Sequence, residues 1–423
     1  MKFKKKNISI LSLIFIFIFS NINPRIRCNV NSWTQTWTND FDYALDIAID
    51  SNDSIYVIGF TENYDNRNDI NVTLLKYNTS GNLIWTKIWK REEFKLSWQL
   101  VLAIDKYDNL YIAGDKNLIK CDSNGNILWN VSYVGFTLDF ISLTIEIDSF
   151  DNIYLASKKN INNKIFIAKF NSSGSQLTNI SWGTIEPVEY ADIKIDNLDN
   201  LYVLTNPKYS ANNYLIKLNS TGNELWNTTF IDDYGLDHKA LALDLNNNIY
   251  TVSERILLKF NNSGDIIWNR ANDFIGCEEL TVDLNGDIYS VETKLGRGPI
   301  IDNTCLDGIT FILTCWSIFV KKYNSSGSFL WEKRLNTCSS YTAEGIVFDS
   351  MNNIYICGTL VLDHSATRRW DIILFKNPSH VRECVRICYD VIILQITLIV
   401  IFSSSIIIIP IYFRKWKFRK KNH

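Results

Sequence analysis

Short runs of alternating apolar and polar residues recur along most of the chain, separated by turns rich in Asn, Asp, Ser and Gly. The segment 46–89 contains four such runs, DIAID, SIYVIG, VTLLKYN and NLIWTKIW, rich in Val, Ile, Tyr and Trp. These residues favour strands, and alternation places every second side chain on one face. Turn residues that tolerate left-handed backbone join the first run to the second and the third to the fourth. The segment therefore predicts a four-stranded antiparallel sheet that needs neighbouring sheets to cover its faces.

Two signatures of this segment recur downstream. The first is a hairpin that begins with Asp and ends with Tyr, and it occurs seven times, at 50–56, 105–111, 148–154, 196–202, 244–250, 283–289 and 349–355. The second is a Gly-containing turn that leads to a Trp strand. It reaches Trp85, Trp129, Trp226, Trp268 and Trp331, and Trp182 by a longer route. That makes six Trp strands, and the seventh hairpin is followed by none.

The missing strand lies at the other end of the chain. SWTQTW (32–37) matches IWTKIW (84–89) position for position, and no inner strands precede it. A closed ring in which the N-terminal strand completes the last sheet explains both anomalies and leaves no long unprotected edge. The sequence therefore predicts an all-β fold, a seven-bladed β-propeller over residues 32–377.

The repeats D-x-x-x-N-x-Y-x-x-G and K-Y-N-x-x-G-x-x-x-W resemble the seven-bladed propeller repeats abbreviated SBBP. They are more distantly similar to the Trp-containing blades of quinoprotein dehydrogenases. The resemblance implies a propeller over about 32–377. It implies no activity, since such propellers are a scaffold for many functions. Quinoprotein dehydrogenases typically carry adjacent cysteines in the active site, and this chain has no Cys-Cys pair.

Both ends of the chain carry segments of a different kind. Residues 1–27 combine a Lys-rich start with an apolar run, as in a secretory signal peptide or an uncleaved signal anchor. Residues 391–413 are almost continuously apolar and long enough to span a bilayer as one helix. The basic tail, 414–423, predicts a cytoplasmic C-terminus, and 378–390 is the linker before the span. The chain is thus expected at the plasma membrane, single-pass, with an extracellular propeller.

The overall charge narrows the classes of partner. The formal net charge is −2, so no basic field favours nucleic acid. We expect no nucleic-acid partner, contact with the membrane through the C-terminal helix, and an extracellular protein or glycan as the ligand.

Loop lengths indicate which face binds this ligand. The first-to-second and third-to-fourth turns of each blade share one end of the propeller, the bottom, and are short and uniform. The other connections share the top and are long and dissimilar, including an insertion at 293–316. Variable loops on a rigid scaffold usually carry specificity. The predicted ligand-contacting residues of the top face are Tyr64, Glu92, Glu93, Trp98, Tyr209, Asp237, His238, Arg297, Asp363, His364 and Arg368.

Four cysteines fall in top connections near the C-terminal blades, at Cys277, Cys305, Cys315 and Cys338. Export favours disulfides, and three pairings of these four are open. We favour Cys305 with Cys315 and Cys277 with Cys338. A metal site is the alternative, but no Cys-x-x-Cys spacing or His partner accompanies them.

No cofactor is predicted from the residues. Asp283, Asn285 and Asp287 have the alternate spacing of a Ca²⁺ loop, but the same positions form the hairpin of every blade and the twelfth-position Glu is absent. We interpret them as a turn. Several Asn-x-Ser/Thr sequons, among them Asn78 and Asn324, lie in turns and are candidate glycosylation sites in an exported protein.

Two functions remain open at this stage. The first is a membrane-anchored surface propeller without catalysis that binds a protein or glycan, in adhesion, envelope organisation or sensing. The alternative is an exported hydrolase or lyase that acts on polysaccharide through top-face acids. A pair of carboxylates about 5 to 10 Å apart beside the central channel would favour the enzyme.

Overall fold

The computed structural model describes the propeller region and leaves out both ends of the chain. The described residues are 32–39, 41–63, 69–91, 99–114, 116–133, 143–159, 164–183, 188–207, 212–231, 238–253, 255–271, 277–299, 312–335, 340–364 and 367–378. Residues 32–377 form one compact unit, and every described strand pair lies within residues 32–378. The predicted signal segment 1–27, linker 378–390 beyond its first residue, span 391–413 and tail 414–423 lie outside the described residues. Within the described ranges, no helix has the length and apolarity needed to cross a membrane.

The described residues form 28 strands in repeating groups of four. The earlier groups are β2 (Phe41–Ile49), β3 (Ile55–Glu62), β4 (Ile70–Tyr77), β5 (Leu83–Lys90); β6 (Val101–Ile104), β7 (Leu110–Ala113), β8 (Asn117–Cys121), β9 (Ile127–Ser132); β10 (Leu143–Ile147), β11 (Ile153–Lys159), β12 (Lys164–Phe170), β13 (Gln176–Trp182); β14 (Val188–Ile195), β15 (Leu201–Pro207), β16 (Asn213–Leu218), β17 (Glu224–Phe230). The later groups are β18 (Ala240–Leu243), β19 (Ile249–Val252), β20 (Ile256–Phe260), β21 (Ile266–Ala271); β22 (Cys277–Val282), β23 (Ile288–Pro299), β24 (Ile312–Tyr323), β25 (Phe329–Arg334); and β26 (Ser340–Phe348), β27 (Asn353–His364), β28 (Thr367–Pro378), β1 (Trp33–Trp37).

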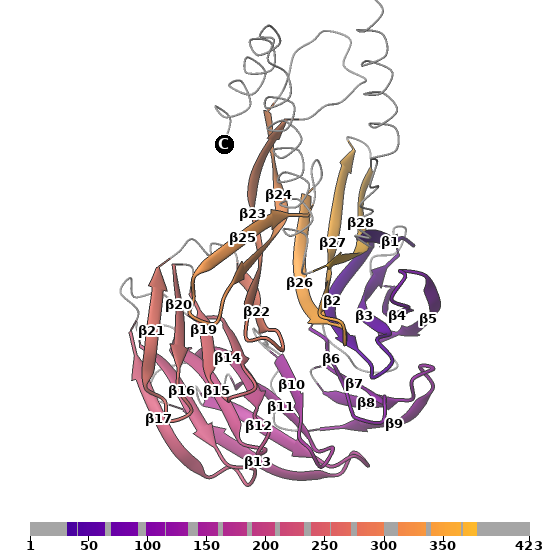
Figure 1. Ribbon diagram of the computed structural model, residues 1–423. Coiled ribbons are helices and arrows are strands. Elements are labelled where there is room, and N and C mark those ends of the chain that lie inside the picture. The colour runs from indigo at the N-terminus through magenta and orange to yellow at the C-terminus, as the bar shows by residue number, and fades with distance from the viewer. Residues whose placement is uncertain are drawn as a thin grey trace, which may run out of the picture. The chain divides into compact units, whose positions relative to one another are not determined.

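These strands assemble as a β-propeller. Five groups are separate four-stranded sheets, and the first and last groups join into one eight-stranded sheet through a single parallel pair, Phe41 with Trp370. The first strands contact one another in chain order, β2, β6, β10, β14, β18, β22 and β26, and β26 contacts β2. The first strands therefore line a central channel, and the sheets follow one another around it from indigo to yellow in Figure 1.

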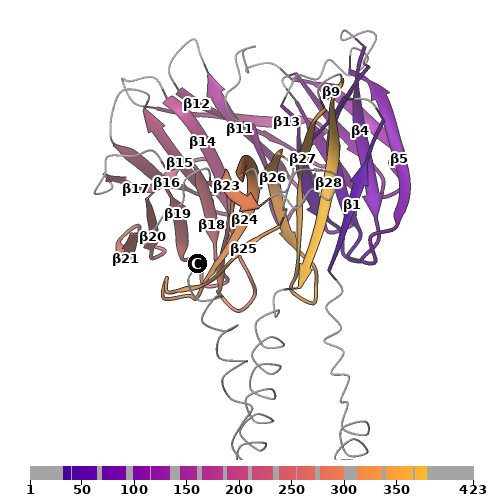
Figure 2. The same ribbon diagram turned by 90° about the horizontal axis from the view of Figure 1, so that it is seen from above.

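The N-terminal strand completes the last group, as the sequence predicted. β1 pairs antiparallel with β28, from Trp33 opposite Lys376 to Trp37 opposite Ile372. Figure 2 shows the indigo β1 beside the yellow β28. β1 is therefore the fourth, outer strand of the last group. The ring of contacts between the groups closes within residues 32–377.

A buried Asp, Tyr and Lys recur in every group and explain the repeated sequence. Asp50 accepts backbone N–H groups of Asn52 and Ser54 through Oδ1, at 3.0 and 2.8 Å, and so closes the turn. Its Oδ2 accepts the Tyr56 hydroxyl at 3.0 Å and lies 3.3 Å from the Lys76 ammonium. Lys76 also lies over the Tyr56 ring, 4.7 Å from the centroid. The buried charges are thus paired, as low-dielectric surroundings require.

The Trp of the outer strand packs on this cluster. Trp85 stands opposite Lys76 in the register and meets the Tyr56 ring edge-on, with centroids 5.9 Å apart. Trp182 does not occupy the equivalent position, because Thr178 stands opposite Lys169. Trp182 instead packs against Tyr214 of the following sheet. The strand that carries Trp182 is the fourth of its group, as predicted, but Trp182 lies farther along it than Trp85 does on its own strand.

In two top connections the described residues continue the adjoining strands. The insertion 293–316 extends the hairpin of β23 and β24, which stay paired as far as Pro299 and Ile312. Likewise β27 runs to His364 and β28 begins at Thr367. These described stretches therefore continue their hairpins instead of forming open loops.

Candidate functional site

The first strands present one face to the core and the other to the channel. In each of them the residue three positions before the hairpin Asp is buried: Ile47, Leu102, Ile145, Ile193, Leu241, Leu280 and Ile346. Residues two and four positions before that Asp point the other way, because side chains alternate along a strand. These side chains therefore face the channel. Of the two, the residue four positions before the Asp lies nearer the top, where the first strands begin.

Five charged side chains occupy these channel-facing positions, and we call them the channel cluster. They are Asp46, Glu146, Asp192, Lys194 and Glu279, on β2, β10, β14 and β22. All five are half-buried. Several of the other channel-facing positions carry no side chain beyond Cβ. Small residues stand at Ala48, Ala103, Ala240, Ala242 and Gly345.

Three of the carboxylates are fixed by the backbone of the next sheet. Asp46 Oδ2 accepts the Leu102 N–H at 2.7 Å, Asp192 Oδ2 accepts the Leu241 N–H at 3.0 Å, and Glu279 Oε2 accepts the Ile346 N–H at 2.6 Å. The strand register shifts beside Asp46 and Glu279, and such bulges re-aim side chains. The carboxylates therefore tie neighbouring sheets together and hold fixed orientations at the channel.

A lysine lies among these acids. Lys194 Nζ is 2.7 Å from Glu146 Oε1, and Asp192 lies two residues before Lys194 on the same face of β14. Thr144 donates to Asp192 Oδ1 at 3.3 Å. Burial disfavours the lysine's charge, but Glu146 and Asp192 outweigh burial and raise the pKa of Lys194. Lys194 is therefore a permanent positive charge at neutral pH.

The acids of the cluster hold their protons more tightly than free carboxyls. Burial is the main cause in each case, and it raises the pKa of Asp46 to about 6 and that of Glu279 to about 8. The pKa values of Glu146 and Asp192 are raised as well, again by burial and against the attraction of Lys194. At neutral pH, Glu279 is thus largely protonated while Asp46 is largely ionised.

Asp46 and Glu279 both lie near Gly345. An added Cβ at Gly345 would lie 2.7 Å from Ile47 Cγ2, 3.5 Å from Glu279 Oε2 and 3.6 Å from the Ile47 nitrogen, which donates to Asp46 Oδ1 at 2.7 Å. The absence of a side chain at Gly345 therefore leaves room for Ile47 beside Glu279. The negative charge of Asp46 further raises the pKa of Glu279.

The cluster suits a positively charged or hydroxyl-rich ligand. Its four carboxyls outnumber the one lysine, and hydrogen bonds already hold three of them in place. Among the described residues, no group of three or more His, Cys, Asp or Glu side chains is arranged to hold a metal ion. The cluster can bind a cation by charge, and its carboxyl pair can in principle exchange protons with a ligand.

Most of the ligand-contacting residues predicted from the sequence lie where the structure gives no side-chain description. Outside the described residues are Tyr64, Glu92, Glu93, Trp98, Tyr209 and Asp237. The strands β23, β27 and β28 contain Arg297, Asp363, His364 and Arg368, without described side chains. These assignments stay predictions.

His238 is placed differently from what the sequence suggested. Its side chain is fully buried, its ring meets Phe230 edge-on at 5.1 Å, and its Nδ1 lies 3.2 Å from the Thr251 hydroxyl. Its backbone N–H donates to Asn213 Oδ1 at 3.0 Å. Burial against an aromatic ring makes His238 a packing residue, and its prediction as an exposed loop ligand was wrong.

The predicted disulfides are not seen in the described part of the chain. Cys305 and Cys338 lie outside it, and the side chain of Cys315 is not described. Cys277 begins β22 and its thiol donates to the Glu279 carbonyl at 3.6 Å. Cys121 and Cys357 are fully buried in the core.

The stretch with calcium-loop spacing forms the turn that the repeat predicts. Asp283 Oδ1 accepts the N–H groups of Asn285 and Asp287, both at 2.9 Å, and Lys322 lies 2.7 Å from Asp287. These oxygens therefore serve the turn and a neighbouring lysine.

Sequence reasoning missed the channel cluster. None of its five residues is among the ligand-contacting residues predicted from the sequence, because all five lie on strands and not in the long loops. The available signal was a charged residue two or four positions before the hairpin Asp, where other repeats carry Ala, Val or Thr.

Comparisons with known proteins address the fold. No protein-family model matches the chain. No curated protein matches it in sequence. The chain is similar to the solved Dos1 propeller, with a TM-score of 0.51 and 11% identity, over 82% of this chain and 94% of that one. At this identity the likeness shows a β-propeller fold and nothing about activity.

Two further solved structures are similar at lower scores. The WD40 domain of Pan2 from Neurospora crassa matches with a TM-score of 0.48 and 9% identity, over 79% of this chain and 89% of that one. The polysaccharide lyase Uly1 matches with a TM-score of 0.47 and 11% identity, over 79% and 89%.

Proposed function

We propose that this chain is a seven-bladed propeller at the cell surface, held to the plasma membrane by residues 391–413, that binds an extracellular protein or glycan at the top of its channel. The ligand presents a positively charged group, such as a basic side chain or an amine on a sugar. This group enters between Asp46, Asp192 and Glu279.

The blade count rests on the repeated cluster. The pairing of Asp with Lys occurs once in each of the groups β2–β5, β6–β9, β10–β13, β14–β17, β18–β21, β22–β25 and β26–β28 with β1. We treat the eight-stranded sheet as two blades, because strand pairing between its halves is limited to a single residue pair.

The observation that carries the proposed function is the fixed set of acids at the channel. Asp46, Asp192 and Glu279 each accept a backbone N–H from the adjacent sheet, so they do not need to reorganise when a cation arrives. Buried acids repel one another, which costs stability, and a cation would relieve that repulsion.

A binding screen tests the proposal. The full chain in detergent micelles is applied to an array of glycans and cell-envelope proteins, beside the variant Asp192→Asn and the control Asp265→Asn, which removes one charge from an exposed outer turn. We expect binding to cationic array members, with at least about tenfold weaker binding by Asp192→Asn and unchanged binding by the control. Equal binding by all three proteins would exclude the channel as the site.

The second candidate is a polysaccharide hydrolase or lyase. The specific support is the pair beside Gly345, where Glu279 has a pKa of about 8 and Asp46 of about 6. Glu279 would serve as the general acid and Asp46 as the base or nucleophile, as two carboxyls do in glycosidases. Mass spectrometry of the screened glycans decides: released fragments that disappear with Glu279→Gln favour the enzyme, and intact glycans favour the binding protein.

A further inference from the structure

Large apolar side chains project from the bottom turns. Every group but the first carries one at the tip of the turn between its first two strands, each between 64% and 75% exposed. We call them the tip residues: Tyr107, Phe150, Leu198, Leu245, Leu284 and Met351. The first group has Asn52 at the equivalent place, which is also exposed. These exposed side chains do not pack in the core, so folding does not explain why they are apolar.

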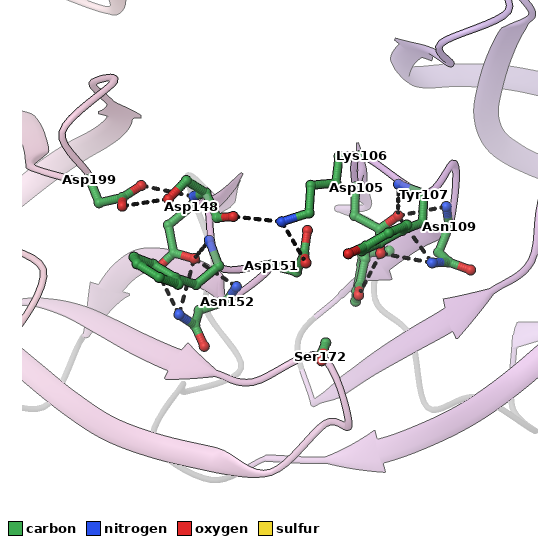
Figure 3. Close-up of polar contacts among 12 residues, drawn as sticks. Asp105, Lys106, Tyr107, Asn109, Asp148, Asp151, Asn152, Ser172 and Asp199 are labelled. Carbon is green, nitrogen blue, oxygen red and sulfur yellow. Dashed lines mark hydrogen bonds and ion pairs between the residues drawn. The ribbon is translucent and has the colours of Figure 1, made fainter.

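The turns that carry them are rigid. Ser51 donates to Asp108 through its backbone N–H and its hydroxyl, both at 2.8 Å, and Ser149 donates to Asp199 in the same way at 2.8 and 2.7 Å. Lys106 bridges to the next turn, 3.1 Å from Asp151, as Figure 3 shows. The tips are therefore presented as a fixed circle around the channel.

The backbone of these turns is satisfied from within. In the second turn, Asp105 Oδ1 accepts the N–H groups of Tyr107 and Asn109, both at 2.9 Å, and the Asp108 N–H donates to the Asp105 carbonyl. A turn with its N–H groups already paired loses little when it leaves bulk water. The tips can thus enter a less polar environment without unpairing their own backbone.

Both described ends of the propeller lie at this same bottom. Trp33 at the start of β1 pairs with Lys376 near the end of β28. Lys376 in turn lies 3.9 Å from Asp349 at the turn between β26 and β27, which carries Met351. From Pro378, about 13 residues lead to the apolar segment 391–413, a reach of at most about 45 Å. The chain thus leaves the propeller on the side of the tip residues.

We propose that the tip residues insert into the interfacial region of the bilayer, so that the bottom of the propeller lies on the membrane and the top faces outward. This inference rests on the proposed anchoring through residues 391–413. The tips are separate side chains on separate turns, and each can be solvated by lipid independently of the others. A protein partner would instead be expected to bury a continuous patch.

The charges of this face indicate the kind of lipid. Lys106 is paired with Asp151, whereas the carboxylates of Asp108 and Asp199 accept hydrogen bonds from neutral serine and asparagine side chains. The turns therefore add no excess of positive charge that would attract an anionic surface. A zwitterionic phosphatidylcholine surface is the expected partner.

The experiment separates this surface from the anchor. Residues 32–377, whose strand pairs and channel lie within one compact unit, are floated with phosphatidylcholine vesicles. The test variant takes residues that the chain itself uses in these turns: Tyr107→Asn, Phe150→Asn, Leu198→Asn, Met351→Asn, Leu245→Ser and Leu284→Ser. The matched control replaces exposed apolar residues of the outer strands, about half exposed: Ile84→Thr, Leu128→Thr, Leu177→Thr and Leu225→Thr. Thermal melting verifies that both variants are folded.

We expect the unchanged propeller and the control to float, and the vesicle partition coefficient of the tip variant to fall at least about tenfold. Vesicles with added phosphatidylserine should bind no more tightly. Equal flotation of tip variant and control, or no flotation of the unchanged propeller, would overturn the inference. So would tip-dependent dimerisation in solution, which would assign the face to a second copy. Carbonate extraction of the full chain tests the anchor separately.

Discussion

Trp33 packs against Tyr355, with ring centroids 5.9 Å apart, although 322 positions separate them along the chain. Its indole N–H also donates to the Thr79 carbonyl of the first group at 3.1 Å, and Lys376 donates to the same carbonyl at 3.1 Å. β1 therefore provides the last group with the Trp that the outer strand provides in other groups. It also links the last group to the first.

The first prediction concerns this closure. Trp33→Ala removes the ring that covers Tyr355 and the bond to Thr79, so we expect the free energy of unfolding to fall by about 2–4 kcal/mol. Urea denaturation followed by circular dichroism measures it. Thr34→Ala is the control, since Thr34 is exposed on the same strand and should change stability by less than about 0.5 kcal/mol. Equal effects of the two substitutions would contradict closure by Trp33.

The second prediction concerns the outer turns. Gly125 has φ of +73°, and an added Cβ would lie 2.8 Å from Lys87 Cγ and 3.0 Å from the Trp85 ring of the preceding group. Gly125→Ala should therefore destabilise the protein by about 2–3 kcal/mol, through both backbone strain and overpacking. Gly286→Ala is the control, because φ is +80° there but the nearest atom is 3.6 Å away. It should cost only about 1 kcal/mol of strain.

A third prediction concerns the buried Asp of the repeat. Burial opposes ionisation of Asp105, but hydrogen bonds from Asn109 and Tyr107 and the charge of Lys120 outweigh it, and the pKa of Asp105 is lowered. Its contribution to stability is thus present above the unfolded pKa of about 3.9 and is lost as pH falls through the folded value. Asp105→Asn should cost about 2–3 kcal/mol at pH 7, because it leaves Lys120 without this ion-pair partner.

The measurement for Asp105 is denaturant unfolding at pH 7 and at pH 3. We expect the difference between the unchanged protein and Asp105→Asn to shrink at pH 3, where the carboxylate is increasingly neutral. Asp265→Asn, in an exposed turn, is the control. A difference that stays the same at both pH values would show that the charge of Asp105 contributes nothing.

The channel cluster predicts the opposite dependence on pH. Because burial raises the pKa of Glu279 to about 8, the folded state holds this proton more tightly than the unfolded state. The resulting stability is complete below the unfolded pKa of about 4.3 and is lost as pH rises through about 8. The thermal midpoint should therefore fall between pH 5 and pH 9, and it should fall less in Glu279→Gln. An identical slope in the variant would contradict this assignment.

The fold was largely readable from the sequence because its restraints are local and repeated. The Asp of each hairpin is bonded to residues two, four and six positions later, so DSNDSIY predicts its own turn. The match between SWTQTW and IWTKIW identified the N-terminal segment as an outer strand. Because the last group lacked its outer strand, the match predicted a contact between the two ends of the propeller. The strand of Trp182 was predicted, but its register was not, because spacing along the chain does not give the residue opposite Trp182.

The candidate site was harder to predict because it arises between repeats. Asp46, Asp192 and Glu279 lie on three different strands, and no spacing along the chain indicates that they face one channel. Their partners, the N–H groups of Leu102, Leu241 and Ile346, are backbone atoms that any sequence supplies. Loop lengths indicated the top loops as the binding site, whereas the described acids of the channel cluster lie on the strands below these loops.

The most direct test of the proposed site is calorimetric titration of the full chain with a short arginine peptide, whose charge does not change with pH. Ionisation of Asp46 and Glu279 should strengthen binding about tenfold or more between pH 5 and pH 9. The double variant Asp46→Asn, Glu279→Gln should bind weakly at both pH values. Equal affinity of the unchanged and double-variant chains at pH 9 would contradict the channel cluster as the binding site.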